Sequence, residues 1–232
     1  MRRKTKIVAT ISDRNCEVDL ISTLHESGMD VVRLNTAHQT HEDSLKVINN
    51  VRKVSDKIAL LLDTKGPEIR TTKAIESIPV SYGDMITVKG DPEGITSKAC
   101  VYVNYRRFVR DVPTGSRILI DDGDIELVVI SKDKNALTCE VANNGEISGR
   151  KSVNIPSVHV KLPTLSLKDI DYIHFAIDHG LDFIAHSFVR NKGDAIAVQK
   201  ILDERESNIK IIAKIENQDG VDNIDEILDH VY

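Results

Sequence analysis

Short apolar runs rich in β-branched residues alternate with longer amphipathic segments in the first and last parts of the chain. The patterns predict five strands, at residues 6–11, 31–35, 58–64, 183–188 and 209–217. Five helices are predicted between and after these strands, at residues 17–27, 41–54, 165–180, 192–206 and 219–231. Regular alternation of strands with helices is typical of a parallel sheet or a (β/α) barrel, so we expect an α/β fold.

Two of the predicted helices end on a glycine that is followed by an apolar residue, an aspartate and a strand. The segments are HESGMDVVRLN around Gly28 and IDHGLDFIAHSF around Gly180. A glycine at this place adopts positive φ without a Cβ clash and therefore ends a helix well. The repetition indicates that a βα module is the building unit of the fold.

Residues 71–160 follow a different pattern. Apolar and polar residues alternate there between DG, GD and NNG turns, and no convincing helical period occurs. We expect a barrel domain that begins at residues 1–70, an inserted antiparallel, β-barrel-like domain at 71–160, and the rest of the barrel at 161–232. An insertion after the third strand starts at the end of a barrel where active sites form, so we expect it to act as a lid. The alternative is an insertion without a catalytic role.

Charged and polar residues stand at the ends of four of the predicted strands. They are Arg33, Asn35, Asp63, Ser187, Lys214 and Glu216. In a parallel barrel these ends converge on one mouth, where such a cluster is costly to desolvate unless the charges meet each other or a ligand. A solvated strand end would explain any one of these residues, whereas four strands together favour a binding site.

This mixture of side chains suits phosphoryl transfer. Arg33 and Lys214 are able to hold a phosphoryl or carboxylate group, and Glu216 is able to bind a hard divalent cation such as Mg²⁺. Catalysis of phosphoryl transfer consists mainly of positioning and charge neutralisation. The sequence has no GxxxxGK[ST] motif, so a nucleotide would bind at the barrel mouth and the lid rather than on a P-loop.

Composition and charge limit the functional classes to which this chain can belong. The 232 residues are 41% hydrophobic, 29% charged and 4% aromatic, with a formal net charge of −5. An acidic chain with few aromatics is a poor match to nucleic-acid binding. The apolar run near the start is too short for a signal peptide, and no later run reaches the length of a membrane span. The three cysteines lack metal-binding or disulfide spacing, so we expect a cytoplasmic protein without nucleic-acid or membrane partners.

Eight segments of the chain together resemble the pyruvate kinase family in their order and spacing. The most specific are LLLDTKGPEIRT and AKIENQDG, and the others are KIVATI, VVRLNTAHQTHE, ILIDDGDIEL, GRKSVNIPSV, LPTLSLKD and DFIAHSFVR. The resemblance implies a (β/α)₈ barrel, a β-rich lid inserted after the third strand, and a separate C-terminal regulatory domain. It also implies phosphoryl transfer from phosphoenolpyruvate to ADP, giving pyruvate and ATP in the last step of glycolysis, by a homotetrameric enzyme.

The resemblance also implies roles for individual residues. Arg33, Lys214 and Ser187 would contact phosphoenolpyruvate, with Lys214 stabilising the charge of the transferring phosphoryl group. Glu216 would be one of two carboxylates on Mg²⁺ or Mn²⁺. The other implied assignments are Asn35, Asp63 and Thr64 as ligands of K⁺, Glu68 as the residue typical of K⁺-requiring members, and His38, Arg70 and Lys151 as residues near the nucleotide.

The chain departs from the family pattern at four points. Residues 35–38 read Asn-Thr-Ala-His where members have Asn-Phe-Ser-His, so Ala37 removes a serine hydroxyl from the K⁺ shell. Residues 12–13 replace a Gly-Pro, and His186 replaces a small residue; we interpret His186 as a hydrogen-bonded residue at the barrel mouth. The chain also stops at Tyr232, before the family's next strand with the second Mg²⁺ carboxylate. We therefore expect five of eight barrel strands and a fragment that is inactive alone.

Two other hypotheses stay open at this point. A lyase or aldolase of the phosphoenolpyruvate/pyruvate barrel type shares an acidic metal site at strand ends, but the long insertion and the Lys65-Gly66-Pro67 segment count against it. The third hypothesis is a truncated, non-catalytic module that binds metal and anion. Binding of ADP separates the kinase from the lyase, and a pyruvate-formation assay separates both enzymes from the non-catalytic module.

Overall fold

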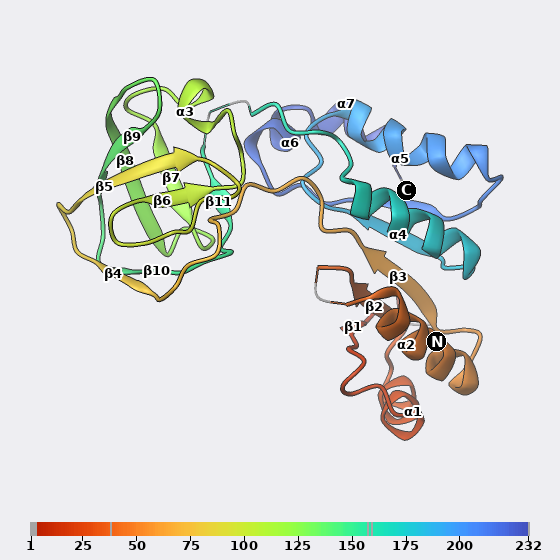
Figure 1. Cartoon of the computed structure of the whole chain (residues 1–232). Coiled ribbons are helices and arrows are strands. Elements are labelled where there is room, and N and C mark those ends of the chain that lie inside the picture. Colours follow the sequence, from red (N-terminus) through yellow and green to blue (C-terminus); the bar gives the residue numbers. More distant parts are fainter. Residues whose placement is uncertain (1–3, 38, 157, 159, 232) are drawn as a thin grey trace. The chain divides into compact units, whose positions relative to one another are not determined.

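The chain folds into two compact units in the computed structural model, which describes residues 4–37, 39–156, 158 and 160–231 (Figure 1). The first unit is Met1–Pro67 together with Pro163–Tyr232, and the second is Glu68–Leu162. Each unit has its own buried apolar core. The second unit is therefore an insertion in the sequence of the first.

The first unit is built on a sheet of five parallel strands. In spatial order they are β1 (Val8–Thr10), β2 (Val31–Asn35), β3 (Ala59–Asp63), β12 (Phe183–His186) and β13 (Lys210–Ala213). All five predicted strands are present, and β3 pairs directly with β12, with Asp63 opposite Ala185. Among the described residues, β1 and β13 each pair on one side only. The prediction of a partial (β/α) barrel is confirmed.

Four helices of the first unit lie where the sequence predicts them: α1 (Val18–Glu26), α2 (His41–Val54), α4 (Leu167–Asp178) and α5 (Lys192–Glu204). Capping boxes start α2 and α4, since the hydroxyls of Thr40 and Ser166 accept hydrogen bonds from the backbone N–H three residues on. Gly28 and Gly180 follow α1 and α4 with φ of 110° and 59°, as predicted. None of the helices in the described ranges is long and apolar enough to cross a membrane.

The helix predicted at residues 219–231 is wrong in its extent. Two short helices stand there, α6 (Gln218–Asp222) and α7 (Ile224–Leu228), with Asn223 between them. The backbone of Asn223 is not helical (φ −105°, ψ 18°), and its side-chain amide donates a hydrogen bond to the carbonyl of Arg190 (2.9 Å). This tertiary hydrogen bond competes with continuation of the helix, and an amphipathic pattern does not reveal it.

Both faces of the five-stranded sheet bury apolar side chains. Val32, Leu60 and Ile184 belong to the main core, which also contains side chains from α2, α4 and α5. Val31 and Leu61 form a smaller cluster with Ala185 on the other face. Burial on both faces is the rule for parallel sheets, and it explains why the strands read as nearly continuous apolar runs.

The second unit contains a six-stranded sheet and a separate pair of strands. The sheet order is β11 (Val153–Asn154), β7 (Arg117–Ile120), β8 (Ile125–Lys132), β9 (Leu137–Val141), β5 (Met85–Gly90) and β6 (Val101–Val103), and the pair is β4 (Ile78–Val80) with β10 (Gly145–Ile147). The strand pairs are antiparallel, as predicted, except that β5 and β6 are parallel. The chain between β5 and β6 therefore returns along the sheet before β6 begins. The turn residues in the sequence predict antiparallel neighbours and do not indicate this connection.

One element of the second unit was not predicted. The helix α3 (Phe108–Asp111) has only four residues, too few to produce a helical period in the sequence. Phe108 is fully buried in the core of this unit, beside Val88 and Leu127. Packing of the aromatic ring therefore accompanies a turn of helix that the sequence pattern does not show.

The two ends of the second unit are tied together by backbone contacts. Arg70 forms a β-bridge with Ser152. The N–H of Thr71 donates to the carbonyl of Lys151 (2.9 Å), and the N–H of Lys151 donates to the hydroxyl of Thr71 (2.9 Å). The chain thus enters and leaves this unit at neighbouring points.

Candidate active site

The carboxylate of Asp63, at the end of β3, is the centre of a charged cluster in the first unit. Its side chain is only 4% exposed. One oxygen, Oδ2, accepts hydrogen bonds from Nε (2.7 Å) and Nη2 of Arg33. The other oxygen, Oδ1, accepts from Nζ of Lys214 (3.1 Å) and lies 3.2 Å from Oγ of Ser187. A buried carboxylate that accepts from this many donors fixes the side chains around it.

Lys214 links Asp63 to Glu216. Its ammonium donates to Oγ of Ser187 (2.8 Å) and lies 3.2 Å from Oε1 of Glu216. The other Glu216 oxygen accepts from the backbone N–H of Phe188 (3.1 Å). The side chains of Lys214 and Glu216 are 30% and 34% exposed, so this side of the cluster is open to a ligand. Two cations and two carboxylates balance the formal charge of the cluster.

Strand register explains how these residues meet. Asn35 at the end of β2 is the direct partner of Asp63 on β3, and the strands run parallel. Arg33 lies two residues earlier on the same face of β2, so its guanidinium reaches the same carboxylate. Its Nη1 also donates to Oγ1 of Thr10, the last residue of β1 (2.7 Å). Thr10 is not among the predicted site residues, although it ends a strand as Asp63 does.

Thr64 and His186 form a buried layer beneath the cluster. The carbonyl of Thr64 accepts from Oγ of Ser187 (2.6 Å), and its Oγ1 lies 3.2 Å from Nδ1 of His186. His186 is 1% exposed. Burial lowers the pKa of His186, while the nearby carboxylates of Asp169 and Asp194 act in the opposite direction. His186 is therefore a buried residue held by a hydrogen bond, as the sequence analysis interprets it.

Gly66 and Asp169 fix the loop that follows β3. Gly66 has φ of +68°, and a Cβ atom there would lie 2.8 Å from the carbonyl oxygen of Ser187. Its N–H donates to Oδ1 of Asp169 (3.2 Å), whose other oxygen completes the capping box of α4. Only glycine combines this backbone angle with so close an approach. The backbone geometry therefore explains why the DTKGP segment has a glycine at this position.

The candidate nucleotide residues Arg70 and Lys151 belong to the second unit, and each contacts a carboxylate there. Nε of Arg70 donates to Oε2 of Glu68 (2.5 Å), and its Nη1 donates to the carbonyl of Arg150 (2.6 Å). Nζ of Lys151 lies 2.5 Å from Oδ2 of Asp121. The sequence analysis did not identify this role of Asp121. The third nucleotide candidate, His38, lies outside the described residues.

Oxygen atoms for a monovalent cation are close together at the ends of β2 and β3. The donor set is the amide oxygen of Asn35, the carboxylate of Asp63 and the oxygens of Thr64. Asn35 is paired with Asp63 in register, and its Oδ1 is oriented by the N–H of Ala37 (3.1 Å). These are hard oxygens, the kind of ligand that K⁺ takes, but both oxygens of Asp63 already accept from Arg33 and Lys214, so the residues fit K⁺ only in part.

The residues fit a divalent cation less well. Glu216 contributes one partly exposed carboxylate, whereas both oxygens of Asp63 accept from Arg33 and Lys214. No group of three or more His, Cys, Asp or Glu side chains able to hold a metal ion occurs within the part of the chain that the structure describes. Mg²⁺ is usually bound through one or two carboxylates plus substrate oxygens. The described residues therefore provide part of a magnesium site and not a complete one.

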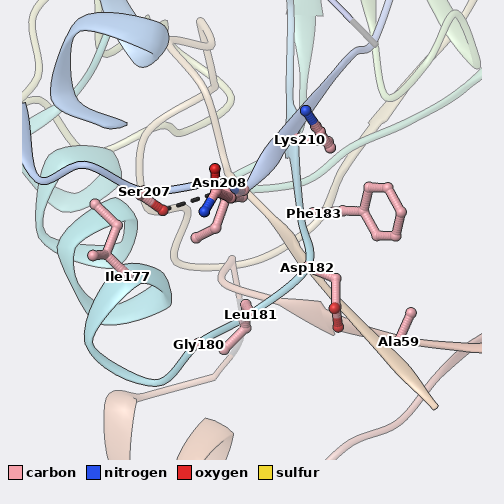
Figure 2. Close-up of a pocket in the computed structure, with 10 residues that line it drawn as sticks. Ala59, Ile177, Gly180, Leu181, Asp182, Phe183, Ser207, Asn208 and Lys210 are labelled. Carbon is pink, nitrogen blue, oxygen red and sulfur yellow. Dashed lines mark hydrogen bonds between the residues drawn. The ribbon is translucent and has the colours of Figure 1, made fainter. Parts of the chain in front are cut away.

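A cavity of about 550 Å³ lies at the opposite ends of the strands (Figure 2). It is lined by residues at the starts of β3, β12 and β13, among them Ala59, Phe183 and Lys210, and by the turn after α4. Ligands of (β/α) barrels bind at the carboxyl ends of the strands. The cluster around Asp63, and not this cavity, is therefore the candidate active site.

Comparisons with known proteins show similarity over nearly the whole chain. The family model described as "Pyruvate kinase, barrel domain" matches residues 2–231. A pyruvate kinase of Borreliella burgdorferi is 50% identical over 224 residues, which are 96% of this chain and 46% of that protein. Pyruvate kinases of Staphylococcus epidermidis and Staphylococcus aureus are 43% and 44% identical over 235 aligned positions, 98% of this chain and 40% of each relative. The chain thus spans less than half the length of these relatives.

Proposed function

The chain belongs to the pyruvate kinase family, and from this premise we propose that it forms the substrate-binding part of an enzyme that transfers a phosphoryl group from phosphoenolpyruvate to ADP. In this reaction the bond between phosphorus and the enol oxygen breaks, and a bond to the terminal ADP oxygen forms. The enolate then takes a proton and becomes pyruvate, with ATP as the second product. The activity is proposed for the intact protein, because the chain covers less than half of its relatives.

The position of Lys214 carries this proposal. Its ammonium lies within 3.2 Å of two carboxylates and a hydroxyl, at the exposed edge of the cluster. A phosphoryl group that approaches Glu216 and Ser187 would meet this ammonium as it transfers. A preorganised cation at that point stabilises the charge that spreads over the phosphoryl oxygens in the transition state.

Arg33 and Ser187 are proposed to bind the substrate. The guanidinium of Arg33 is held by Asp63 and Thr10, so its orientation is fixed before a ligand arrives. A fixed guanidinium is suited to a phosphate or carboxylate because it loses little freedom on binding. Ser187 lies between Asp63 and Lys214 and supplies a hydroxyl to the same space.

The nucleotide is proposed to contact Arg70 and Lys151 of the second unit, together with His38. We infer that the insertion, residues 71–160 by the sequence pattern, acts as a lid that brings these residues to the substrate. Its separate core and its closely tied entry and exit support a unit that moves as one body. We also infer the homo-oligomeric state and cytoplasmic location that are usual for the family.

The proposed metal ions would be bound by oxygen ligands. Asn35, Asp63 and Thr64 would hold K⁺, with Glu68 as a further residue typical of K⁺-requiring members. A monovalent cation held there would supply positive charge to the site. Glu216 would supply one ligand of Mg²⁺ or Mn²⁺, and the described residues do not complete that site.

The test is an assay of an intact protein, made by joining this chain to the segment that follows the matched region in the Borreliella burgdorferi relative. We expect pyruvate to form from phosphoenolpyruvate only when ADP, Mg²⁺ and K⁺ are all present. Pyruvate formation without ADP would favour the lyase hypothesis. Binding of ADP without any turnover would favour the non-catalytic module.

A further inference from the structure

The backbone of Lys151 is fixed in place by the second unit. Both its N–H and its carbonyl hydrogen-bond to Thr71, at 2.9 Å each, and Thr71 is 2% exposed. The preceding residue, Arg150, has φ of 64°, which few side-chain-bearing residues adopt. Only the side chain of Lys151, which is 39% exposed, is therefore free to change its position.

The loop opposite Lys151 has an unusual backbone. Asp121, Asp122 and Gly123 have φ of 55°, 56° and 100°, so three left-handed residues follow one another. Residues other than glycine rarely adopt this conformation, although aspartate and asparagine tolerate it better than most. It persists only when surrounding contacts impose it, and it is frequently associated with function.

Ser152, the neighbour of Lys151, supplies those contacts. Its carbonyl accepts from the N–H of Asp121 (2.9 Å), and its hydroxyl accepts from the N–H of Asp122 (3.0 Å). The same hydroxyl donates to Oδ1 of Asp122 (2.9 Å). These contacts direct the carboxylate of Asp121 to Nζ of Lys151 at 2.5 Å. The strained loop therefore serves to place one carboxylate against one ammonium.

We propose that Asp121 is a positioning residue that holds the ammonium of Lys151 and competes with the phosphates of the nucleotide for it. This inference rests on the proposed role of Lys151 in nucleotide binding. Both partners are about one-third exposed, and such ion pairs are weak in water. A polyphosphate carries several charges and displaces the single carboxylate, whereas a monoanion competes poorly. Asp121 thus favours di- and triphosphates over singly charged anions at this position.

The first measurement is the reactivity of Lys151 toward an amine-acetylating ester, followed by mass spectrometry on the 232-residue chain. Asp121→Asn removes the charge and keeps a residue type that tolerates positive φ, so the fold is preserved. We expect Lys151 to react about two to five times faster in this variant, the range that follows from loss of an exposed ion pair. Asp124→Asn is the matched control, because it removes the same charge from the same loop, and no ion pair joins Asp124 to Lys151 among the described residues.

The second measurement is the affinity for inorganic tripolyphosphate and for ADP by calorimetry. We expect Asp121→Asn to bind tripolyphosphate about two to five times more tightly, and Asp124→Asn to differ from the parent chain by less than about 1.5-fold. The proposal would be overturned if Lys151 reacted equally fast in the parent chain and in Asp121→Asn. It would also be overturned if reactivity or tripolyphosphate affinity rose equally in Asp121→Asn and Asp124→Asn. In another possible result, tripolyphosphate binds more tightly to Asp121→Asn than to the parent chain and Asp124→Asn, while ADP binds to none of the three proteins. That result would support Asp121 as the competitor and contradict the proposed role of Lys151 in nucleotide binding.

Discussion

At the residue scale, the contacts of Lys214 lead to a sharp prediction for catalysis. In the intact protein, Lys214→Met removes the only ammonium that contacts both Asp63 and Glu216 among the described residues. We expect the turnover number to fall by about 10²- to 10³-fold, the usual effect of losing one preorganised charge contact. The Michaelis constant for phosphoenolpyruvate should change much less, because Arg33 and Ser187 remain.

A matched control exists on the same strand. Lys210 begins β13, at the end of the sheet that lines the cavity in Figure 2. Lys210→Met therefore removes a lysine from the same element without touching the cluster around Asp63, and we expect turnover within about twofold of the parent. If Lys214→Met also retained turnover within about threefold, the assignment of Lys214 would be incorrect.

Ala37 predicts an altered response to K⁺. Its N–H orients the amide oxygen of Asn35, but its methyl group supplies no oxygen to the cation shell. Adding a hydroxyl with Ala37→Ser should lower the half-saturating K⁺ concentration of the intact protein, since it would add one oxygen ligand to the proposed cation site.

The K⁺ titration is run on the parent, Ala37→Ser and Ala37→Gly. The glycine variant changes the side chain without adding an oxygen, so it controls for a general effect of substitution in this loop. A half-saturating K⁺ concentration that stays the same in Ala37→Ser would contradict the cation site at Asn35, Asp63 and Thr64.

Asp194 provides a prediction about pH and stability. Burial raises the pKa of Asp194, but hydrogen bonds from the side chain and backbone of Arg190 outweigh it, and the pKa lies below the usual 3.8. The carboxylate therefore stabilises the fold above pH 3.8, and this contribution is lost as the pH falls through the lowered pKa. Asp194→Asn removes the carboxylate that pairs with Arg190 and should lower the free energy of unfolding at pH 7 by about 3 kcal/mol.

The measurement is urea unfolding of the parent chain and Asp194→Asn between pH 7 and pH 3. We expect the difference in stability to be constant down to about pH 4 and to shrink below it, because Asp194 then becomes protonated in the parent. Asp203→Asn, near the other end of α5 and exposed, should show no such change. A difference that stays constant down to pH 3 would show that Asp194 is not the titrating group.

Much of the candidate site could be predicted because strand ends follow a simple rule. Arg33, Asp63 and Lys214 end apolar runs, and parallel strands bring their ends together. Asp121 could not be found in this way, because its contact with Lys151 depends on two left-handed residues and on the hydroxyl of Ser152. A DDG triplet indicates a turn, but it does not indicate where the carboxylate of that turn will point.

At the scale of elements, the loop after β3 predicts a large effect of a small substitution. Gly66→Ala imposes a Cβ atom 2.8 Å from the carbonyl oxygen of Ser187 and a side chain at φ +68°. Gly180→Ala imposes the same kind of backbone angle, φ +59°, with no atom within 4 Å of the new Cβ. Gly180→Ala should cost about 1 kcal/mol in the free energy of unfolding, and Gly66→Ala about 1–3 kcal/mol more because of overpacking.

Thermal or urea unfolding of the two variants separates the backbone angle from the clash. Similar losses of stability in both would show that the loop adjusts to the methyl group and that Ser187 does not confine Gly66. A larger loss in Gly66→Ala is expected to be accompanied by weaker substrate binding in the intact protein, since Ser187 and Thr64 are part of the same hydrogen-bonded layer.

The elements themselves were predictable where the periodic pattern was long. Helices α2 and α4 combine an amphipathic repeat with a capping box, so local sequence and packing favour the same conformation. The pattern failed at Asn223, where a side-chain bond to Arg190 ends α6, and at the parallel pair of β5 and β6. Both depend on partners distant in the sequence, which periodicity does not encode.

At the scale of the whole molecule, the open sheet predicts that this chain alone does not catalyse the reaction. A closed barrel of this kind needs eight strands, and the described residues form five. Among the described residues, β1 and β13 each pair on one side only, and Ile7 and Val8 are 44% and 51% exposed. We therefore expect concentration-dependent self-association through these edges and no measurable pyruvate formation.

Sedimentation of the 232-residue chain, together with the assay containing phosphoenolpyruvate, ADP, Mg²⁺ and K⁺, tests this prediction. Turnover of about 1–100 per second, the ordinary range of kinases, would show that five strands and one magnesium carboxylate are sufficient. A chain that stays monomeric at high concentration would contradict the expected exposure of the sheet edges.

The pairing of β3 with β12 also constrains the order of folding. About 120 residues separate these neighbouring strands in the sequence, so an unfolded insertion would form a long loop that must close before they pair. Because Arg70 bridges Ser152, a folded insertion shortens this loop about threefold and lowers the entropic cost of closure by about 1 kcal/mol. We therefore expect the insertion to fold first and to gain protection from hydrogen exchange before the β3 and β12 pair does.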